Sequence, residues 1–246
     1  GNAGADPVLP QQTQLLAGER YFASDRMIYE KKTEDTFAVL NVPTDVTGNI
    51  SLLDGTREIG SRAFFRCTGL TGIAAAQMNR VKTIGAYAFA GCADLQEALI
   101  GEDCRNLSES AFADCENLET VIWLGDTAEV GEAVFAENPR LSTVYFGSDT
   151  GTRITSVGSS TFEDCTSLQM VYFEAGVRKI GDACFRNCVN MRTSIAGTYA
   201  AACETIGDYA FAGCARYTQT LALYDGLQEL GRGAFLDCTG LNSMWL

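Results

Sequence analysis

The apolar residues of this chain recur in a fixed pattern from residue 59 onward. Each block opens with Ile, Leu or Val, has phenylalanine five residues later and, with one exception, cysteine three residues after that; the first block is IGSRAFFRCTGL. Eight phenylalanines define the blocks: Phe64, Phe89, Phe112, Phe135, Phe162, Phe185, Phe211 and Phe235. Their spacings are 25, 23, 23, 27, 23, 26 and 24 residues. Such a period is typical of a solenoid in which each repeat forms one turn.

Within a repeat, two apolar periodicities follow one another. Ala63, Phe64 and Cys67 fall on one side of a single helical turn, which predicts a short helix or turn with one buried face. Leu118, Val121 and Trp123 then show the alternation of a short strand. One repeat cannot bury these residues alone. We therefore expect stacked repeats whose strands pair in parallel from turn to turn.

The consensus IGxxAFxxCxxLxxVxF resembles the BspA-type leucine-rich repeats of bacterial cell-surface proteins. The likeness covers residues 59–246, and its clearest departure is Asn138 at a cysteine position. The expected fold is an α/β right-handed leucine-rich-repeat solenoid of about eight turns. It would carry a parallel β-sheet on the concave face and short helices or turns on the convex side.

The two ends of the chain differ from the repeats. Residues 1–20 are polar and contain two prolines, as expected for a linker. Residues 21–58 are interpreted as an N-terminal capping hairpin that leads into the solenoid, with a turn at KKTED and a second strand over Phe37 to Val42. The last residue, Leu246, is an inward strand position, so the sequence ends on a strand with an unpaired edge. Copies of the chain could associate through this C-terminal edge strand.

Composition excludes several classes of function. The chain has 31 acidic and 18 basic residues, a net charge of −13 and no histidine. Catalytic groups and zinc sites that require histidine are therefore ruled out. An acidic chain also binds nucleic acid poorly, because both carry negative charge. The sequence contains no run of 18 apolar residues, so we expect no membrane insertion. The N-terminus lacks the charged and apolar blocks of a signal peptide.

Cysteines and carboxylates are the remaining candidates for chemistry. All ten cysteines fall on core positions of the repeats, which favours buried free thiols over disulfides or a metal site. Oxygen-bearing side chains two residues after the phenylalanine form a column: Asp114, Glu137, Asp164 and Asn187. Calcium binding or a glycosidase pair is conceivable there, but solvated turn residues are the favoured interpretation. We expect no cofactor, no metal and no enzymatic activity.

The outward side of the predicted strands is the candidate ligand-binding face. Aromatic and aliphatic side chains follow one another there on neighbouring strands, a composition typical of binding surfaces. The predicted ligand-binding residues on this concave face are Leu99, Ile122, Tyr145, Met170, Tyr172 and Trp245. The alternative is that such side chains simply suit an open sheet.

These observations lead to a hypothesis of a non-enzymatic module that binds an extracellular protein or glycan. The family resemblance implies an exported or cell-surface protein that acts in adhesion or in host or cell interaction, with a lipid anchor through a removed N-terminal segment as one possibility. The alternative is a structural spacer or self-assembly unit of a larger surface protein. A glycan-active enzyme that uses carboxylates alone would need a deep cleft, which the repeats do not predict.

Overall fold

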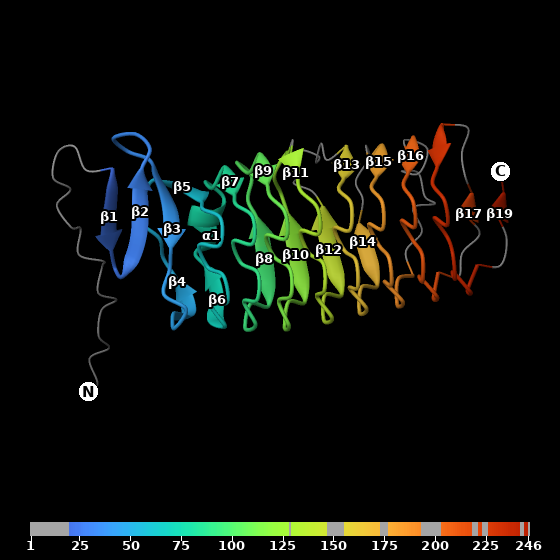
Figure 1. Ribbon diagram of the computed structural model, residues 1–246, viewed down its shortest axis with the longest axis horizontal. Helices are drawn as coiled ribbons and strands as arrows, with labels where there is room; N and C mark the ends of the chain where they lie inside the picture. Colours follow the sequence, from blue (N-terminus) through green and yellow to red (C-terminus); the bar gives the residue numbers. More distant parts are fainter. Residues whose placement is uncertain are drawn as a thin grey trace.

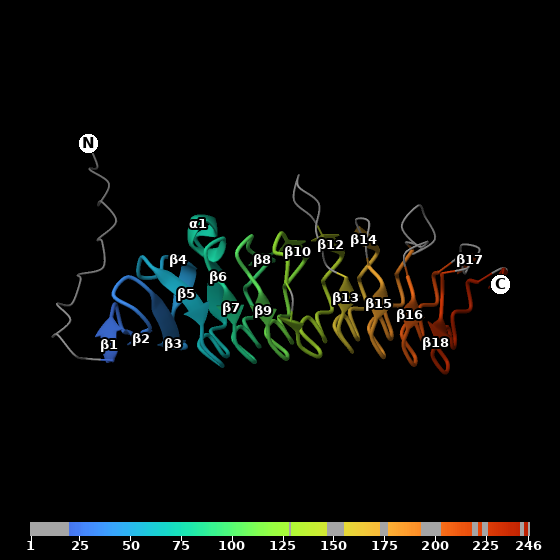
Figure 2. The same cartoon turned by 90° about the horizontal axis from the view of Figure 1, so that it is seen from above.

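The protein is an elongated stack of similar turns (Figures 1 and 2). The computed structural model describes residues 20–127, 129–146, 155–172, 177–192, 203–217, 221–222, 226–241 and 244–245. Over these residues the chain makes about seven turns, built almost entirely from strands and tight turns, with one short helix. The leucine-rich-repeat solenoid predicted from the sequence is confirmed, with slightly fewer turns than the eight expected.

Two rows of parallel strands run along the stack. In the first row, short strands contain the Ile, Leu or Val that opens each repeat: β5 (Thr56–Ile59), β7 (Thr83–Ile84), β9 (Asn106–Leu107), β11 (Glu129–Val130), β13 (Ser156–Val157), β15 (Lys179–Ile180), β16 (Thr205–Ile206) and β18 (Glu229–Leu230). The pairing is continuous from β5 to β11 and again from β13 to β18.

The second row contains the strands predicted from the Leu-x-x-Val alternation. Its main part is a four-stranded parallel sheet of β8 (Glu97–Ile100), β10 (Thr120–Trp123), β12 (Thr143–Phe146) and β14 (Met170–Tyr172). Two smaller parallel pairs flank it in the sequence, β4 (Thr47–Ile50) with β6 (Gly69–Ile73) and β17 (Leu221–Ala222) with β19 (Met244–Trp245). The helix α1 (Ala75–Met78) follows β6 directly.

The N-terminal cap is a three-stranded antiparallel unit. The predicted hairpin is present as β2 (Met27–Lys31) and β3 (Phe37–Asn41), and β3 pairs in parallel with β5 as expected. The sequence interpretation missed β1 (Tyr21–Ser24), which pairs with β2. The proposed linker at residues 1–20 lies, apart from residue 20, outside the described residues.

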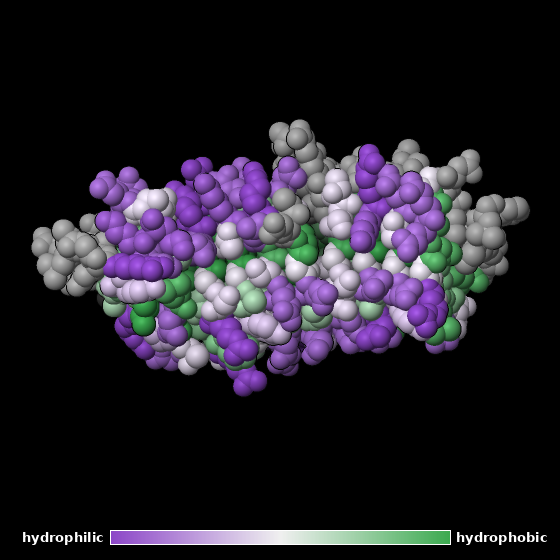
Figure 3. Space-filling model, turned by 45° about the horizontal axis from the view of Figure 1, so that its top comes forward, coloured by the Kyte–Doolittle hydropathy of each residue, from purple (hydrophilic) through white to green (hydrophobic). Residues whose placement is uncertain are grey.

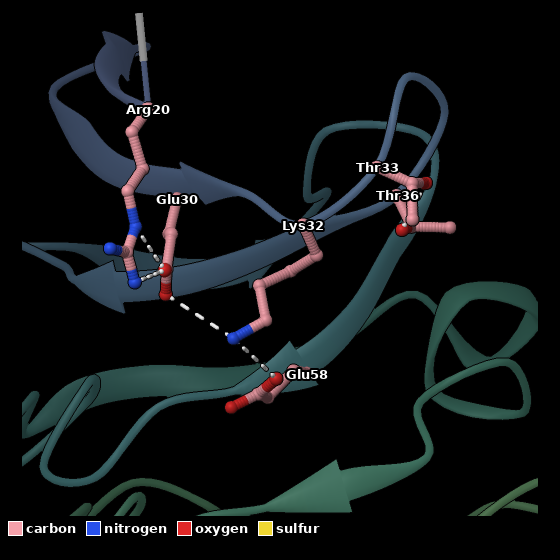
Figure 4. A network of polar contacts seen from close by, with 6 residues as sticks. All are labelled: Arg20, Glu30, Lys32, Thr33, Thr36 and Glu58. Atoms are coloured by element: carbon pink, nitrogen blue, oxygen red, sulfur yellow. Dashed lines mark hydrogen bonds and ion pairs between the residues drawn. The ribbon is translucent and has the colours of Figure 1, made fainter.

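A polar network ties the cap to the first repeat (Figure 4). Arg20 donates two hydrogen bonds to Oε1 of Glu30, from Nε at 2.8 Å and from Nη2 at 2.6 Å, and Arg20 lowers the pKa of this carboxyl group. Lys32 Nζ lies 3.4 Å from Oε2 of Glu30 and 3.5 Å from Oε2 of Glu58. Because Glu58 belongs to β5, these contacts connect the cap with the solenoid.

The phenylalanines of the repeats form a continuous column of stacked rings. All eight take part, and the seven steps have centroid distances of 4.8 to 5.6 Å and interplanar angles of 2 to 16°. Seven of the eight rings have a relative exposure of 2% or less in the interior of the stack, for example Phe135 and Phe162 at 0%. The repeat register inferred from the sequence is therefore correct.

The segments around the phenylalanines are turns rather than helices. Residues two before and two after each phenylalanine have positive φ, for example Ser160 at 52° and Asp164 at 59°, which interrupts a right-handed helix. Their N–H groups bond to the next turn instead, as Ser160 N does to Asp182 O at 2.8 Å. The turns approach closely, since a Cβ on Gly181 would lie 2.6 Å from Ser159 N.

The cysteines are hydrogen-bond donors within the core. At six repeat positions the thiol Sγ lies 3.1 to 3.3 Å from the phenylalanine carbonyl oxygen of the preceding turn, as Cys188 does from Phe162 O: Cys92, Cys115, Cys165, Cys188, Cys214 and Cys238. Asn138 takes over this role in its repeat, with Nδ2 2.9 Å from Phe112 O. Each thiol adds a second hydrogen bond to a carbonyl oxygen that already accepts one within its own repeat, as Phe162 O does from Cys165 N at 3.2 Å.

All ten cysteines are buried free thiols, as the repeat register predicts. We expect protein denatured without any exposure to reductant to titrate ten thiols with a chromogenic disulfide reagent. Native protein should react much more slowly, because a buried thiol is shielded and stays protonated. A count of six or fewer in the denatured state would show that disulfide bonds form in the protein.

Candidate binding surface

The predicted binding row lies on the β8–β14 sheet in continuous register. Leu99 pairs with Ile122, Ile122 with Tyr145, and Tyr145 with Tyr172, one from each of the four strands. The intervening residues of each strand point inward, and Trp123 and Phe146 are buried. Tyr145 is 48% exposed, whereas Leu99 and Ile122 are half-buried. The two faces of the sheet are therefore assigned as the sequence predicts wherever side chains are described.

Three of the predicted residues are placed by their backbone alone. Met170 pairs with Thr143, so it lies in the row beside the aromatic one, and Tyr172 continues the aromatic row. Trp245 pairs with Ala222 in the separate β17–β19 sheet, outside the four-stranded sheet. The side chains of Met170, Tyr172 and Trp245 lie outside the described residues.

An open pocket lies at the edge of the sheet beside Leu99. Its volume is about 400 Å³, and Leu70, Met78, Leu95 and the core ring of Phe89 are among the side chains that line it. Glu97 contributes to the same lining and is exposed. Polar and apolar atoms contribute about equally to its surface, and its volume lies within the range of ligand sites.

The pocket exists because the second row of strands is interrupted. The strand β6 pairs with β4, and β8 pairs with β10, but the described residues show no pairing between β6 and β8. The chain turns into α1 after Ile73, where the second to fifth repeats continue as the strands β8, β10, β12 and β14. Sequence reasoning missed this site. The available signal was the segment GIAAAQM in the first repeat, which lacks the Val-x-aromatic ending of LETVIW.

A second hollow lies along the first row of strands. It has a volume of about 790 Å³ and is lined by residues of the β9 and β11 turns, together with Thr155 and Ser156. It coincides with the break in pairing between β11 and β13. Its walls lack the aromatic side chains of the β8–β14 sheet, so we regard it as a less suitable docking surface.

The oxygen column proposed for calcium is a consequence of turn geometry. Asp114, Glu137, Asp164 and Asn187 all have positive φ, between 54 and 61°, a conformation that asparagine and aspartate adopt more readily than most residues. Asn187 Nδ2 donates to Asp164 Oδ1 at 2.8 Å. Among the described residues no group of His, Cys, Asp or Glu could hold a metal ion.

The chain belongs to the BspA type leucine-rich repeat family. The family matches in six copies over residues 44–155 and 149–246, which together are more than half of the chain. A comparison with curated proteins finds no match.

Solved bacterial leucine-rich repeat proteins have the same fold. A protein from Bacteroides ovatus is 21% identical (83% of this chain, 65% of that chain, TM-score 0.52). One from Eubacterium ventriosum is 17% identical (89% of this chain, 50% of that chain, TM-score 0.64). The T. pallidum leucine rich repeat protein is 19% identical (87% of this chain, 86% of that chain, TM-score 0.54). The chain thus spans less than two thirds of the first two proteins.

The visible surface of the molecule has polar margins and a less polar centre. Hydrophilic side chains border the visible side of the stack, and a band of neutral and apolar residues runs lengthwise between them (Figure 3). In the part of the chain that the structure describes, no helix is long and apolar enough to cross a membrane.

Proposed function

We propose that this protein is a non-enzymatic binding module whose ligand is an extracellular protein or glycan, held by the outward face of the β8–β14 sheet. The observation that carries the proposal is the row of Leu99, Ile122 and Tyr145 on adjacent strands, beside an open pocket. A partly exposed tyrosine on a rigid sheet offers a large contact area at a low entropic cost.

The proposal includes an exported or cell-surface location and a role in adhesion. Its support is the membership of the BspA-type repeat family, together with a surface in which contact residues stand on strands rather than on loops. The same residues give no support to catalysis, since the described part of this face presents one carboxylate at the pocket, Glu97, and no second catalytic group beside it.

The test is a screen of purified protein on a printed array of glycans and extracellular-matrix proteins, followed by variants of the sheet face. We expect Tyr145→Ser combined with Leu99→Ser to weaken binding to each array ligand about tenfold or more, since a desolvated anchor is worth about 2 kcal/mol. Affinity is measured by biolayer interferometry, and folding by circular dichroism.

A matched control removes exposed apolar side chains elsewhere. Tyr21 in β1 and Leu236 in the last repeat are 53% and 52% exposed, so Tyr21→Ser with Leu236→Ser makes the same chemical change away from the sheet. We expect this control to bind normally. Equal binding by the two double variants would show that the ligand site lies elsewhere on the molecule.

A self-assembly or spacer function is the second candidate. Its support is the exposure of Leu230 (43%) and Leu236 (52%) on the last described repeat, whereas Ile180 and Ile206 at the position of Leu230 are buried. Sedimentation velocity at increasing concentration distinguishes the two proposals. Association without any ligand, abolished by Leu230→Glu with Leu236→Glu, would favour self-assembly over the binding of a separate ligand.

A further inference from the structure

A cluster of two arginines and two aromatic rings stands on the turn side of the first two repeats. The arginines are Arg62 and Arg66, both exposed, and the rings are those of Phe65 and Tyr87, both half-buried. The Arg62 guanidinium lies 5.3 Å from the ring centroids of both Phe65 and Tyr87, and the Arg66 guanidinium lies 5.3 Å from the Phe65 centroid. The two cations are therefore no further apart than twice this distance.

The backbone under these arginines is unusual. Arg62 and Arg66 both have a φ of 57°, in the left-handed region. At the Arg66 position every other repeat has glycine, asparagine or an acidic residue: Gly91, Asp114, Glu137, Asp164, Asn187, Gly213 and Asp237. Arginine gains nothing from this conformation, which carries a small steric cost. Its presence at this position needs an explanation other than turn geometry.

The two guanidinium groups are available to a ligand. Neither forms an ion pair with any residue that the structure describes, although the chain carries 13 more negative than positive charges. Stacking on an aromatic ring fixes the plane of a guanidinium and leaves its N–H edges free. Such edges bind carboxylate oxygens in pairs.

We infer that this cluster, Arg62, Phe65, Arg66 and Tyr87, is a docking site for an extended acidic segment of a partner protein. Carboxylates two residues apart on a strand are about 7 Å apart, which fits the upper limit on the separation of the two cations. A long polyanion such as a sulfated polysaccharide is disfavoured, because the net charge of −13 repels it beyond the local site. A short acidic segment senses mainly the two arginines, since salt screens distant charges.

The site is separate from the proposed sheet surface. Arg62, Phe65 and Arg66 lie in the turn between β5 and β6, and Tyr87 lies in the corresponding turn between β7 and β8. Its partner chemistry therefore does not depend on the ligand of the β8–β14 sheet, and the failure of one proposal leaves the other intact.

The test measures fluorescence anisotropy of a labelled short peptide with glutamate at alternate positions, at about 50 mM NaCl, where screening is weaker than at physiological salt. We expect binding by the full chain, and loss of affinity of about tenfold or more with Arg62→Asn and Arg66→Asn combined. Asparagine tolerates positive φ, so this variant should keep its melting temperature.

Two controls make the outcome decisive. The variant Arg140→Asn with Arg216→Asn removes the same charge from two exposed arginines on other repeats and should bind the peptide within twofold of the parent. A peptide with glutamine in place of glutamate should not bind. The inference is wrong if the parent chain does not bind the peptide, if both double variants bind it equally, or if heparin binds at this cluster and the peptide does not.

Discussion

The protein should lose most of its stability between pH 8.5 and pH 10, with reductant present throughout. Burial raises the pKa of the thiols: to about 11 for Cys67, Cys104 and Cys238, and to about 12 for Cys115 and Cys165. The pKa values of Cys92, Cys184, Cys188, Cys203 and Cys214 are raised for the same reason. The native core therefore holds neutral thiols where the unfolded chain, with thiol pKa values near 9.0, holds thiolates.

The direction of the effect follows from proton linkage. A group with a raised pKa in the folded state contributes its stabilisation fully below the unfolded value, and this contribution is lost as the pH rises toward the folded value. Each thiol whose pKa is strongly raised then costs about 1.4 kcal/mol per pH unit above 9, and the nine such thiols, all except Cys203, together cost on the order of 10 kcal/mol at pH 10. This is comparable with the whole stability of an ordinary domain.

The measurement is urea denaturation followed by circular dichroism at several pH values. A matched variant is Cys184→Ala, because alanine occupies the same position in Ala63, Ala88 and Ala210. The free energy of unfolding of this variant should fall less steeply with pH than that of the parent, by the equivalent of about one proton. A free energy of unfolding that stays constant from pH 8 to pH 10 would contradict the assignment of ten buried neutral thiols.

The solenoid could be derived from the sequence because its signal is repeated. A single Ala-Phe pair with a cysteine is ambiguous, but eight copies fix the register of the strands in the regular repeats, and the stacked Phe162 and the inward Trp123 follow from it. The turn conformation could not be derived in this way. The apolar spacing places Ala63, Phe64 and Cys67 on one buried side both in a helical turn and in a turn with positive φ. The hydrogen bonds between repeats determine which of these two conformations forms.

The candidate site was predictable only where the repeat is regular. Leu99, Ile122 and Tyr145 follow from counting along the repeats, because identical turns place identical positions in one row. The pocket beside Leu99 arises from an exception to the repeat, the helix α1 in the first repeat. The Arg62 cluster arises from a different exception, the arginines in the turn of the same repeat. Departures from a consensus carry no periodic signal, and their consequences depend on three-dimensional packing against neighbouring turns.

Replacing Phe162 with alanine should cost about 3 to 5 kcal/mol of unfolding free energy. The ring is fully buried, stacks on Phe135 at 5.6 Å and on Phe185 at 5.4 Å, and meets Phe146 edge-on at 6.5 Å. In a solenoid each turn is stabilised mainly by its neighbours, so a cavity at the centre weakens the coupling of the two halves. Urea denaturation should therefore show a lower midpoint and a less cooperative transition than the parent protein.

Phe235 occupies the same repeat position but is half-buried and stacks on one described ring of the column, Phe211. Phe235→Ala should therefore cost clearly less than Phe162→Ala and leave the central repeats cooperative. Equal losses for the two variants, or a loss below about 1 kcal/mol for Phe162→Ala, would show that ring stacking is not what couples the turns.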